Sequence, residues 1–164
     1  MIDLTPYSEK VRQDLEVLGY ATTEWVTPQD GIYDVIIVGG GQSGMGAAFG
    51  LLRERVQKVL IIDENPAGQE GPWGTYARMI TLRTPKQLTS IDLGVPSLTF
   101  QSWWVAQHGL ESWEAIDKIK RQDWLAYLDW YRAVLSLPVQ NETRLTALKP
   151  QADGPYQLQV ETPS

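Results

Sequence analysis

The sequence predicts an α/β fold, in which strands of a parallel sheet alternate with helices and a β-hairpin follows near the end of the chain. Two apolar runs, residues 33–38 and residues 59–62, lack the alternation of a strand with one wet face. Such runs are typical of parallel strands that are covered on both faces. A glycine-rich segment and an amphipathic helix separate the runs, so these elements form a strand, helix and strand unit.

Residues 1–30 are expected to form a helical arm ahead of the main domain. Apolar side chains recur at helical spacing before a glycine suited to end a helix, namely Val11, Leu15, Leu18 and Gly19. Residues 20–31 then include Pro28 and have the turn-rich composition of a linker. We therefore place a boundary near Asp30 and expect one further domain over residues 31–164.

A glycine motif joins the first apolar run to the helix. Gly39, Gly41 and Gly44 follow the pattern G-x-G-x-x-G, which predicts a dinucleotide site in this strand-to-helix context. Gly39 permits the tight turn, Gly41 lets the backbone approach a pyrophosphate, and Gly44 lets the helix pack closely on the strand. The N–H groups and the dipole at the helix N-terminus favour the phosphates. The alternative interpretation is that GGGQSG only turns a strand into a helix.

The helix after this motif is predicted to bury one stripe of side chains. The stripe consists of Met45, Ala48, Phe49 and Leu52. The second apolar run follows and ends at an acidic pair, Asp63 and Glu64.

Asp63 is the stronger candidate of this pair for the ribose of a dinucleotide. It directly follows the run VLII and lies 24 residues after Gly39. A carboxylate at this place accepts the ribose hydroxyls and repels a 2′-phosphate, which favours FAD or NAD over NADP. The alternative interpretation of Asp63 is a charge at a strand end that faces solvent.

The rest of the chain gives weaker patterns. Residues 65–74 are rich in Gly and Pro and are expected to form a loop, while residues 76–100 support no firm assignment. A helix is predicted from Asp123 to before Pro138, with an apolar stripe made of Trp124, Leu128, Tyr131 and Leu135. Residues 143–148 and 156–160 alternate and flank a turn, so they predict the hairpin.

The composition excludes several kinds of function. With 14 Lys and Arg against 20 Asp and Glu, the net charge is -6, whereas nucleic-acid binding needs a basic surplus. The sequence has no cysteine and a single histidine, His108, so we expect no metal site, disulfide or thiol nucleophile. It shows no signal-peptide pattern and no apolar run of about 20 residues, so we expect a cytoplasmic protein without membrane contact.

Four segments together resemble the FAD/NAD(P)-dependent oxidoreductases of the flavoprotein monooxygenase type. They are YDVIIVGGGQSG, IIDE, GQEGPWG and DWLAYLDWYRAVLSLPV, in this order within residues 33–160. The resemblance implies an N-terminal, Rossmann-like FAD-binding portion with an inserted helical segment. Members of this family also carry a second glycine motif for NAD(P)H and a late strand that completes the FAD site. This sequence has neither, so the resemblance implies a partial FAD-binding domain and NAD(P)H bound through a region outside this chain.

The resemblance also implies which residues bind the cofactor. They are Gly39, Gly41, Gln42, Ser43 and Gly44 at the pyrophosphate, Asp63 and Glu64 at the ribose, Trp73 and Gly74 at the flavin side, and Leu145 near the adenine. No side chain is assigned a catalytic role, because the flavin carries the chemistry in this family.

Three further features of the sequence are interpreted from their residues. Arg83 follows the loop that contains Trp73 and is a candidate to bind an anionic group such as a phosphate or a reduced flavin. The alternative interpretation of Arg83 is an ordinary surface arginine. His108 is expected to be a loop residue. For Trp124 and Trp130 we favour packing over a role as an aromatic wall beside a ligand.

The function expected is the FAD-binding portion of a flavin-dependent oxidoreductase of monooxygenase type, with NAD(P)H as reductant and a small-molecule substrate. One alternative is a truncated, non-catalytic module that binds a dinucleotide weakly or not at all and self-associates through exposed apolar surface. A weaker alternative is a small NAD-dependent dehydrogenase, for which the chain lacks a Tyr-x-x-x-Lys pair.

Overall fold

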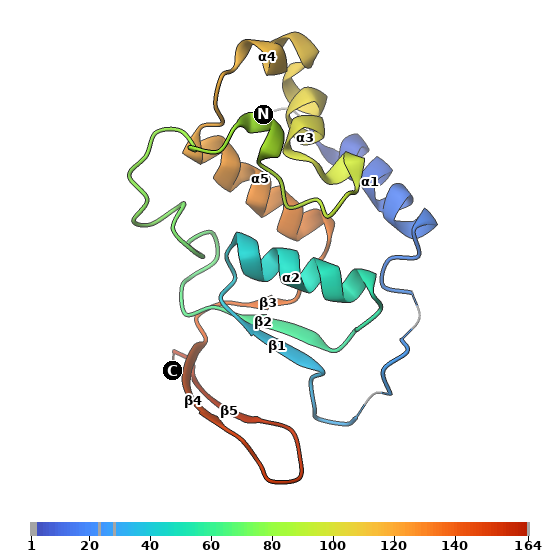
Figure 1. Ribbon diagram of the computed structural model, residues 1–164, viewed down its shortest axis with the longest axis vertical. Coiled ribbons are helices and arrows are strands. Elements are labelled where there is room, and N and C mark those ends of the chain that lie inside the picture. The colour runs from blue at the N-terminus through green and yellow to red at the C-terminus, as the bar shows by residue number, and fades with distance from the viewer. Residues whose placement is uncertain (1–2, 23, 28, 164) are drawn as a thin grey trace.

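The computed structural model describes residues 3–22, 24–27 and 29–163, so Pro28 of the expected linker lies outside the described residues. The structure confirms the α/β fold, with a small parallel sheet, helices on one side of it and a separate antiparallel hairpin (Figure 1). Helix α2 lies on the sheet, the remaining helices lie beyond α2, and the hairpin lies at the opposite end of the molecule.

The sheet is built from the predicted strand, helix and strand unit and one further strand. Strand β1 (Val35–Val38) pairs in parallel with β2 (Val59–Ile62), and helix α2 (Gln42–Arg53) connects them. Strand β3 (Val139–Gln140) pairs in parallel with the other edge of β2. The sequence did not predict β3, because two residues after a proline are too few to show a periodic pattern.

Strand β1 is less covered than its sequence predicts. Val35, Ile36 and Ile37 are half-buried and Val38 is 57% exposed, whereas β2 is mostly buried. The strand order β1-β2-β3 places β1 at an edge, and its outer face lines an open cleft beside the hairpin. The prediction that β1 is covered on both faces is therefore wrong for the described residues.

The two long central helices bury the stripes that the sequence predicts. In α2 these are Met45, Ala48, Phe49 and Leu52, and around α5 (Arg121–Val134) they are Trp124, Leu128, Tyr131 and Leu135. Helix α5 ends four residues before Pro138, since Ser136 already has a left-handed backbone with φ 52°.

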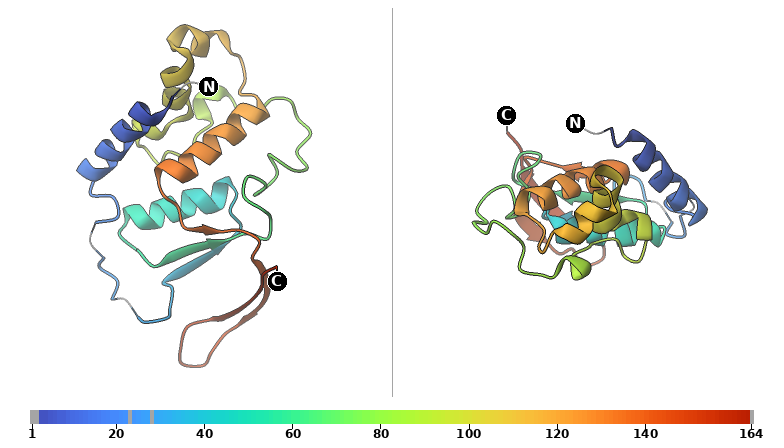
Figure 2. Two further views of the ribbon diagram at one scale, coloured as in Figure 1. Left: turned by 180° about the vertical axis from the view of Figure 1, so that it is seen from behind. Right: turned by 90° about the horizontal axis from the view of Figure 1, so that it is seen from above.

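Helix α1 (Thr5–Val17) packs against α5, as Figure 2 shows from behind. Its Val11 and Leu15 are buried, but Leu18 lies after the last helical turn and is 53% exposed, so the predicted stripe is one residue too long. Gly19 ends the helix with φ 68°, and the N–H groups of Gly19 and Tyr20 donate to the carbonyls of Glu16 and Leu15. This is the paired bonding of a Schellman motif.

Residues 76–100, which the sequence left unassigned, contain two short 3₁₀ helices, Lys86–Leu88 and Pro96–Leu98, and run into α3 (Phe100–His108). His108 is thus the last residue of a helix, and the prediction of a loop residue is wrong. Aromatic residues on several sides of α3 hide the helical period there. The exposed His108 ring lies 4.4 Å from the ring of Trp104, and α4 (Leu110–Ala115) follows.

Aromatic side chains make up much of the core between α3 and α5. The ring of Phe100 lies 5.8 Å from that of Trp124 and 5.4 Å from that of Tyr127, and all three are buried. Trp130 is half-buried and stacks on Tyr7 of α1 at 5.7 Å. Both Trp124 and Trp130 thus pack in or against the core as expected, and Trp124 also lines a cavity beside α2.

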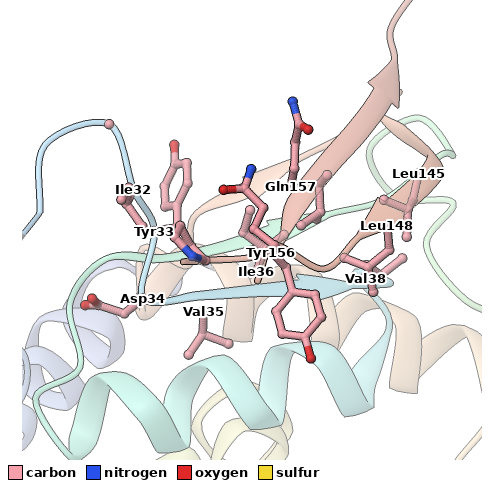
Figure 3. Close-up of a pocket in the computed structure, with 14 residues that line it drawn as sticks. Ile32, Tyr33, Asp34, Val35, Ile36, Val38, Leu145, Leu148, Tyr156 and Gln157 are labelled. Atoms are coloured by element: carbon pink, nitrogen blue, oxygen red, sulfur yellow. The ribbon is translucent and has the colours of Figure 1, made fainter. Parts of the chain in front are cut away.

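The predicted hairpin is present as β4 (Arg144–Lys149) and β5 (Gln157–Glu161), which pair antiparallel with a register shift between Leu145 and Ala147. Figure 3 shows the cleft of about 720 Å³ between this hairpin and the outer face of β1. None of the described helices has the length and the apolar character that crossing a membrane requires.

Candidate dinucleotide-binding site

The turn from β1 into α2 depends on two of its glycines. Gly39 has φ 107°, in the left-handed half of backbone space, and its N–H donates to the carbonyl of Ile62 at 2.8 Å. A Cβ on Gly44 would lie 1.9 Å from the carbonyl oxygen of Gly39, far inside van der Waals contact. These observations match the physical roles that the motif predicts for both residues.

The N-terminus of α2 offers N–H groups to an anion. Gly41 is the N-cap residue with an extended backbone, and no side chain of the described residues caps this helix. The first N–H groups of a helix have no partner inside it, so those of Gln42, Ser43 and Gly44 face outward from the turn. Ser43 is exposed, and a Cβ on Gly41 would lie 3.5 Å from the Cα of Gly71, so the loop after β2 passes beside this turn.

Gly40 is a site residue that the sequence analysis missed. A Cβ there would lie 3.0 Å from Cγ of Glu70, 3.2 Å from Cγ1 of Val139 and 3.3 Å from Cβ of Asp63. The general motif G-x-G admits other residues at its middle position, so the glycine at that position was the available signal that a side chain does not fit there. Its lack of a side chain lets two acidic residues and β3 close around the turn.

Asp63 contacts the turn, and Glu64 does not contact it. Asp63 is 6% exposed, and its Oδ2 accepts a hydrogen bond of 2.7 Å from the N–H of Gly40. Its Oδ1 accepts from both the backbone N–H and the side-chain amide of Asn65, at 2.8 and 2.9 Å. Glu64 is exposed and lies 3.5 Å from Nε of Arg144. The structure therefore places Asp63, and not Glu64, in hydrogen-bond contact with the glycine turn.

A partly buried ion pair holds the loop after β2 against this turn. Arg132 of α5 lies 2.6 Å from Oε1 of Glu70, whose side chain is 9% exposed. Arg132 also donates to the carbonyl of Val139 at 3.1 Å and to Oδ1 of Asn141 at 2.9 Å. Burial, followed by the charge of Glu70, raises the pKa of the nearby Asp129. No local pattern in the sequence predicts this network, because its members lie up to 71 residues apart.

At the other end of the turn, Gln42 connects two tryptophans. Its Oε1 accepts from Nε1 of Trp73 at 3.0 Å and from Nε1 of Trp124 at 3.1 Å. All three residues line a cavity of about 250 Å³ together with Arg83 and Ser90. The structure therefore brings together Gln42, Trp73 and Arg83, which the sequence analysis named as candidates, and adds Trp124.

Gly74 and Leu145, the candidates for the flavin side and the adenine, do not line this cavity. A Cβ on Gly74 would lie 2.8 Å from the carbonyl oxygen of Gly68, so the packing of the loop accounts for that glycine. The Leu145 side chain lines the cleft on the outer face of β1 (Figure 3). The backbone just before it does meet the end of β2, since the N–H of Thr143 donates to the carbonyl of Asp63 at 2.8 Å.

A second cavity, of about 430 Å³, lies at this end of β2. Glu64, Asn65 and Arg144 line it, together with residues at the end of β5. The two cavities and the glycine turn thus adjoin the carboxyl ends of the parallel strands, where α/β folds bind their ligands. Among the described residues, no three acidic or histidine side chains gather closely enough to hold a metal ion.

Comparison with known proteins agrees with this geometry. A family model described as FAD-NAD(P)-binding matches residues 36–160. The chain is 58% identical over 155 residues to the FAD-dependent urate hydroxylase of Xanthomonas campestris pv. campestris. The alignment covers 92% of this chain and 33% of that protein.

Solved structures show the same similarity. A flavin monooxygenase from Stenotrophomonas maltophilia matches with a TM-score of 0.56 and 25% identity, over 77% of this chain and 36% of that one. A cadaverine monooxygenase from Erwinia amylovora, solved with FAD bound, matches in fold with a TM-score of 0.61 and 18% identity, over 80% of this chain and 31% of that one.

The chain thus spans about a third of the length of the relatives that it matches. The family model covers most of the chain, including the glycine turn and the hairpin. The chain therefore belongs to the FAD-NAD(P)-binding family, which confirms the resemblance to FAD/NAD(P)-dependent oxidoreductases drawn from its sequence.

Proposed function

We propose that this chain binds FAD with the pyrophosphate on the N-terminus of α2. The observation that carries the proposal is the turn itself, in which Gly44 packs against the carbonyl of Gly39 and leaves the N–H groups of the first helical turn facing outward. In this arrangement Gly41 and Ser43 contact the phosphates. The Asp63 carboxylate accepts hydrogen bonds from the N–H groups of Gly40 and Asn65, and its remaining lone pairs would accept a hydrogen bond from a ribose hydroxyl.

The two cavities give the proposed orientation of the cofactor. The adenosine end lies toward the cavity beside Glu64 and Arg144, and the flavin end lies toward the cavity lined by Trp73 and Arg83. The guanidinium of Arg83 is exposed there and favours the negative charge that a flavin gains on reduction. The carboxylate of Asp63 disfavours NADP, because it repels a 2′-phosphate.

We further propose that the protein to which this chain corresponds is a flavin-dependent monooxygenase. The similarity to a urate hydroxylase supports urate, or a related small heterocycle, as the substrate to test first. Bound FAD would accept hydride from NAD(P)H and react with oxygen. The residues of this chain would bind and orient the cofactor, and the NAD(P)H site would lie in a region outside the chain.

The binding proposal is tested by an absorption spectrum of the purified protein and by titrations with FAD, NAD and NADP. Trp73 and Trp124 line the cavity at the proposed flavin end, so tryptophan fluorescence reports on occupancy. We expect saturable quenching by FAD, weaker quenching by NAD and the weakest by NADP. Absence of a flavin band and of quenching by all three would leave the glycine turn as a fold element only, as the alternative of a non-binding module requires.

Catalysis is tested separately, with the FAD-loaded chain, NADH or NADPH, and urate. We expect binding of FAD without urate-dependent oxidation of NAD(P)H, because the reductant site is proposed to lie elsewhere. The FAD-dependent urate hydroxylase of Xanthomonas campestris is the positive control. Urate-dependent turnover by the chain alone would contradict the proposed location of the NAD(P)H site.

A further inference from the structure

The amide of Gln42 has a fixed orientation, because two tryptophans donate to the same atom of it. Nε1 of Trp73 lies 3.0 Å from Oε1, and Nε1 of Trp124 lies 3.1 Å from the same oxygen. An indole N–H can only donate, so the atom that receives both bonds must be the carbonyl oxygen. The two donors come from the loop after β2 and from α5, which restrain the amide from two sides.

This orientation leaves the amide nitrogen for a ligand. Gln42 lines the cavity of about 250 Å³, and no described residue accepts a hydrogen bond from its Nε2. An amide N–H₂ group can only donate, so in this cavity it fits a ligand that presents an acceptor atom.

We propose that Trp73 and Trp124 are positioning residues that hold Gln42 so that its N–H₂ group donates to an acceptor atom on the flavin half of bound FAD. This proposal rests on the proposed binding of FAD. Trp124 thereby gives α5 a part in the cofactor site, although it lies 82 residues from Gln42 in the sequence. The flavin half is favoured over the phosphates because the cavity lies beside Trp73 and Arg83.

The Gln42→Glu variant separates the two roles of this side chain. A glutamate keeps an oxygen for both indoles but has no N–H to donate. We expect the melting temperature without ligand to stay unchanged, and the FAD dissociation constant to rise at least about fivefold. ADP has the phosphates without the flavin, so its dissociation constant should change less than about twofold.

Two outcomes of this comparison would overturn the proposal. If the variant binds FAD as tightly as the parent, Gln42 is only an acceptor for the indoles. If FAD and ADP weaken by the same factor, the added charge repels the phosphates and no flavin contact is involved. Failure of the parent protein to bind FAD at all would instead overturn the proposed function on which this inference rests.

A double-mutant cycle tests the tryptophans. Trp73→Phe and Trp124→Phe are each expected to weaken FAD binding about threefold in the parent, and to have almost no effect in a Gln42→Met background. Equal effects in both backgrounds would show that the tryptophans act independently of Gln42, which contradicts the proposal. Trp124 is 2% exposed, so Trp124→Phe can destabilise the fold. Trp73 is half-buried, so Trp73→Phe tests the same coupling to Gln42 with a smaller effect on stability.

Discussion

Gly44 and Gly46 lie two residues apart in α2, but only Gly44 lacks room for a side chain. A Cβ on Gly44 meets the carbonyl oxygen of Gly39 at 1.9 Å, whereas a Cβ on Gly46 meets nothing within 4 Å. Gly44→Ala should therefore push the helix off the turn and lower the free energy of unfolding by about 3 kcal/mol. Gly46→Ala should raise it by up to about 1 kcal/mol, because alanine favours the helix.

Urea denaturation of both variants measures this difference. The FAD dissociation constant of Gly44→Ala should also rise, since the N–H groups of the turn move with the helix. An unfolding free energy for Gly44→Ala equal to that of the parent would show that the turn tolerates a side chain, contrary to its packing here.

Asp63 and Glu64 are neighbours in the sequence with different surroundings. Asp63 is buried and bonded to the N–H of Gly40, whereas Glu64 is exposed and 3.5 Å from Arg144. Asp63→Asn should raise the FAD dissociation constant about tenfold, because a charged acceptor at the ribose is lost. Glu64→Gln should change it less than about twofold. The reverse order of effects in a fluorescence titration would make Glu64 the ribose ligand.

At the scale of elements, the hydroxyls of two half-buried tyrosines attach α1 and the residues just after it to the rest of the molecule. The hydroxyl of Tyr7 donates to the carbonyl of Ser97 at 2.6 Å, and that of Tyr20, just after α1, donates to the carbonyl of Leu135 at 3.1 Å. Burial raises the pKa of both Tyr7 and Tyr20 to about 12. Burial also raises the pKa of Tyr127 and Tyr131 in α5.

These shifts predict a loss of stability at alkaline pH. Above the ordinary tyrosine pKa of about 10 the unfolded chain releases protons that the folded protein keeps, so the free energy of unfolding falls as pH rises. Urea denaturation should show full stability below pH 10 and a decline from about pH 10 to 12. The Tyr7→Phe, Tyr20→Phe double variant should decline less steeply, and the exposed Tyr156→Phe should decline like the parent. An identical slope for all three proteins would refute the assignment.

The loop after β2 is joined to α5 by the ion pair of Glu70 and Arg132, with side chains 9% and 27% exposed. Arg132→Met leaves the Glu70 carboxylate buried without its cation, and should lower the free energy of unfolding by about 3 kcal/mol. Arg144→Met breaks the exposed pair with Glu64 and should cost less than about 1 kcal/mol. If urea denaturation gives the same loss of unfolding free energy for the two variants, the pair of Glu70 and Arg132 does not hold the loop.

The elements that the sequence predicted well are those with a local pattern. Helix α2 combines a glycine motif with a four-residue stripe, and both lie within residues 39–52. The hairpin likewise has two alternating runs around one turn. Strand β3 could not be predicted, because its two residues become a strand only by pairing with Ile61 and Ile62.

The same distinction holds for the candidate site. The glycines and Asp63 follow from spacing within one strand, helix and strand unit. Trp124 and Arg132 could not be predicted as site residues, because each reaches the site from α5 through contacts across more than 60 residues of sequence. The exposure of Val38 was missed because an apolar run does not reveal whether its strand lies at a sheet edge.

At the scale of the whole molecule, the candidate site runs along the carboxyl edge of the parallel sheet. The cavity lined by Glu64 and Arg144, the glycine turn and the cavity lined by Trp73 adjoin the carboxyl ends of β1 and β2. The opposite region, between β1 and the hairpin, is an apolar cleft with exposed Val38, Leu148 and Tyr156. The expected self-association of the chain stays a prediction, and this cleft is one of the places where apolar side chains are exposed.

We propose above that FAD binds with its pyrophosphate on the N-terminus of α2. Titration of ¹⁵N-labelled protein with FAD, followed by two-dimensional NMR, tests it most directly, because each backbone N–H reports its own surroundings. We predict the largest shifts for Gln42, Ser43 and Gly44, together with the indole N–H signals of Trp73 and Trp124. Shifts confined to the cleft lined by Val38 and Leu148, or no saturable shifts at all, would contradict the account.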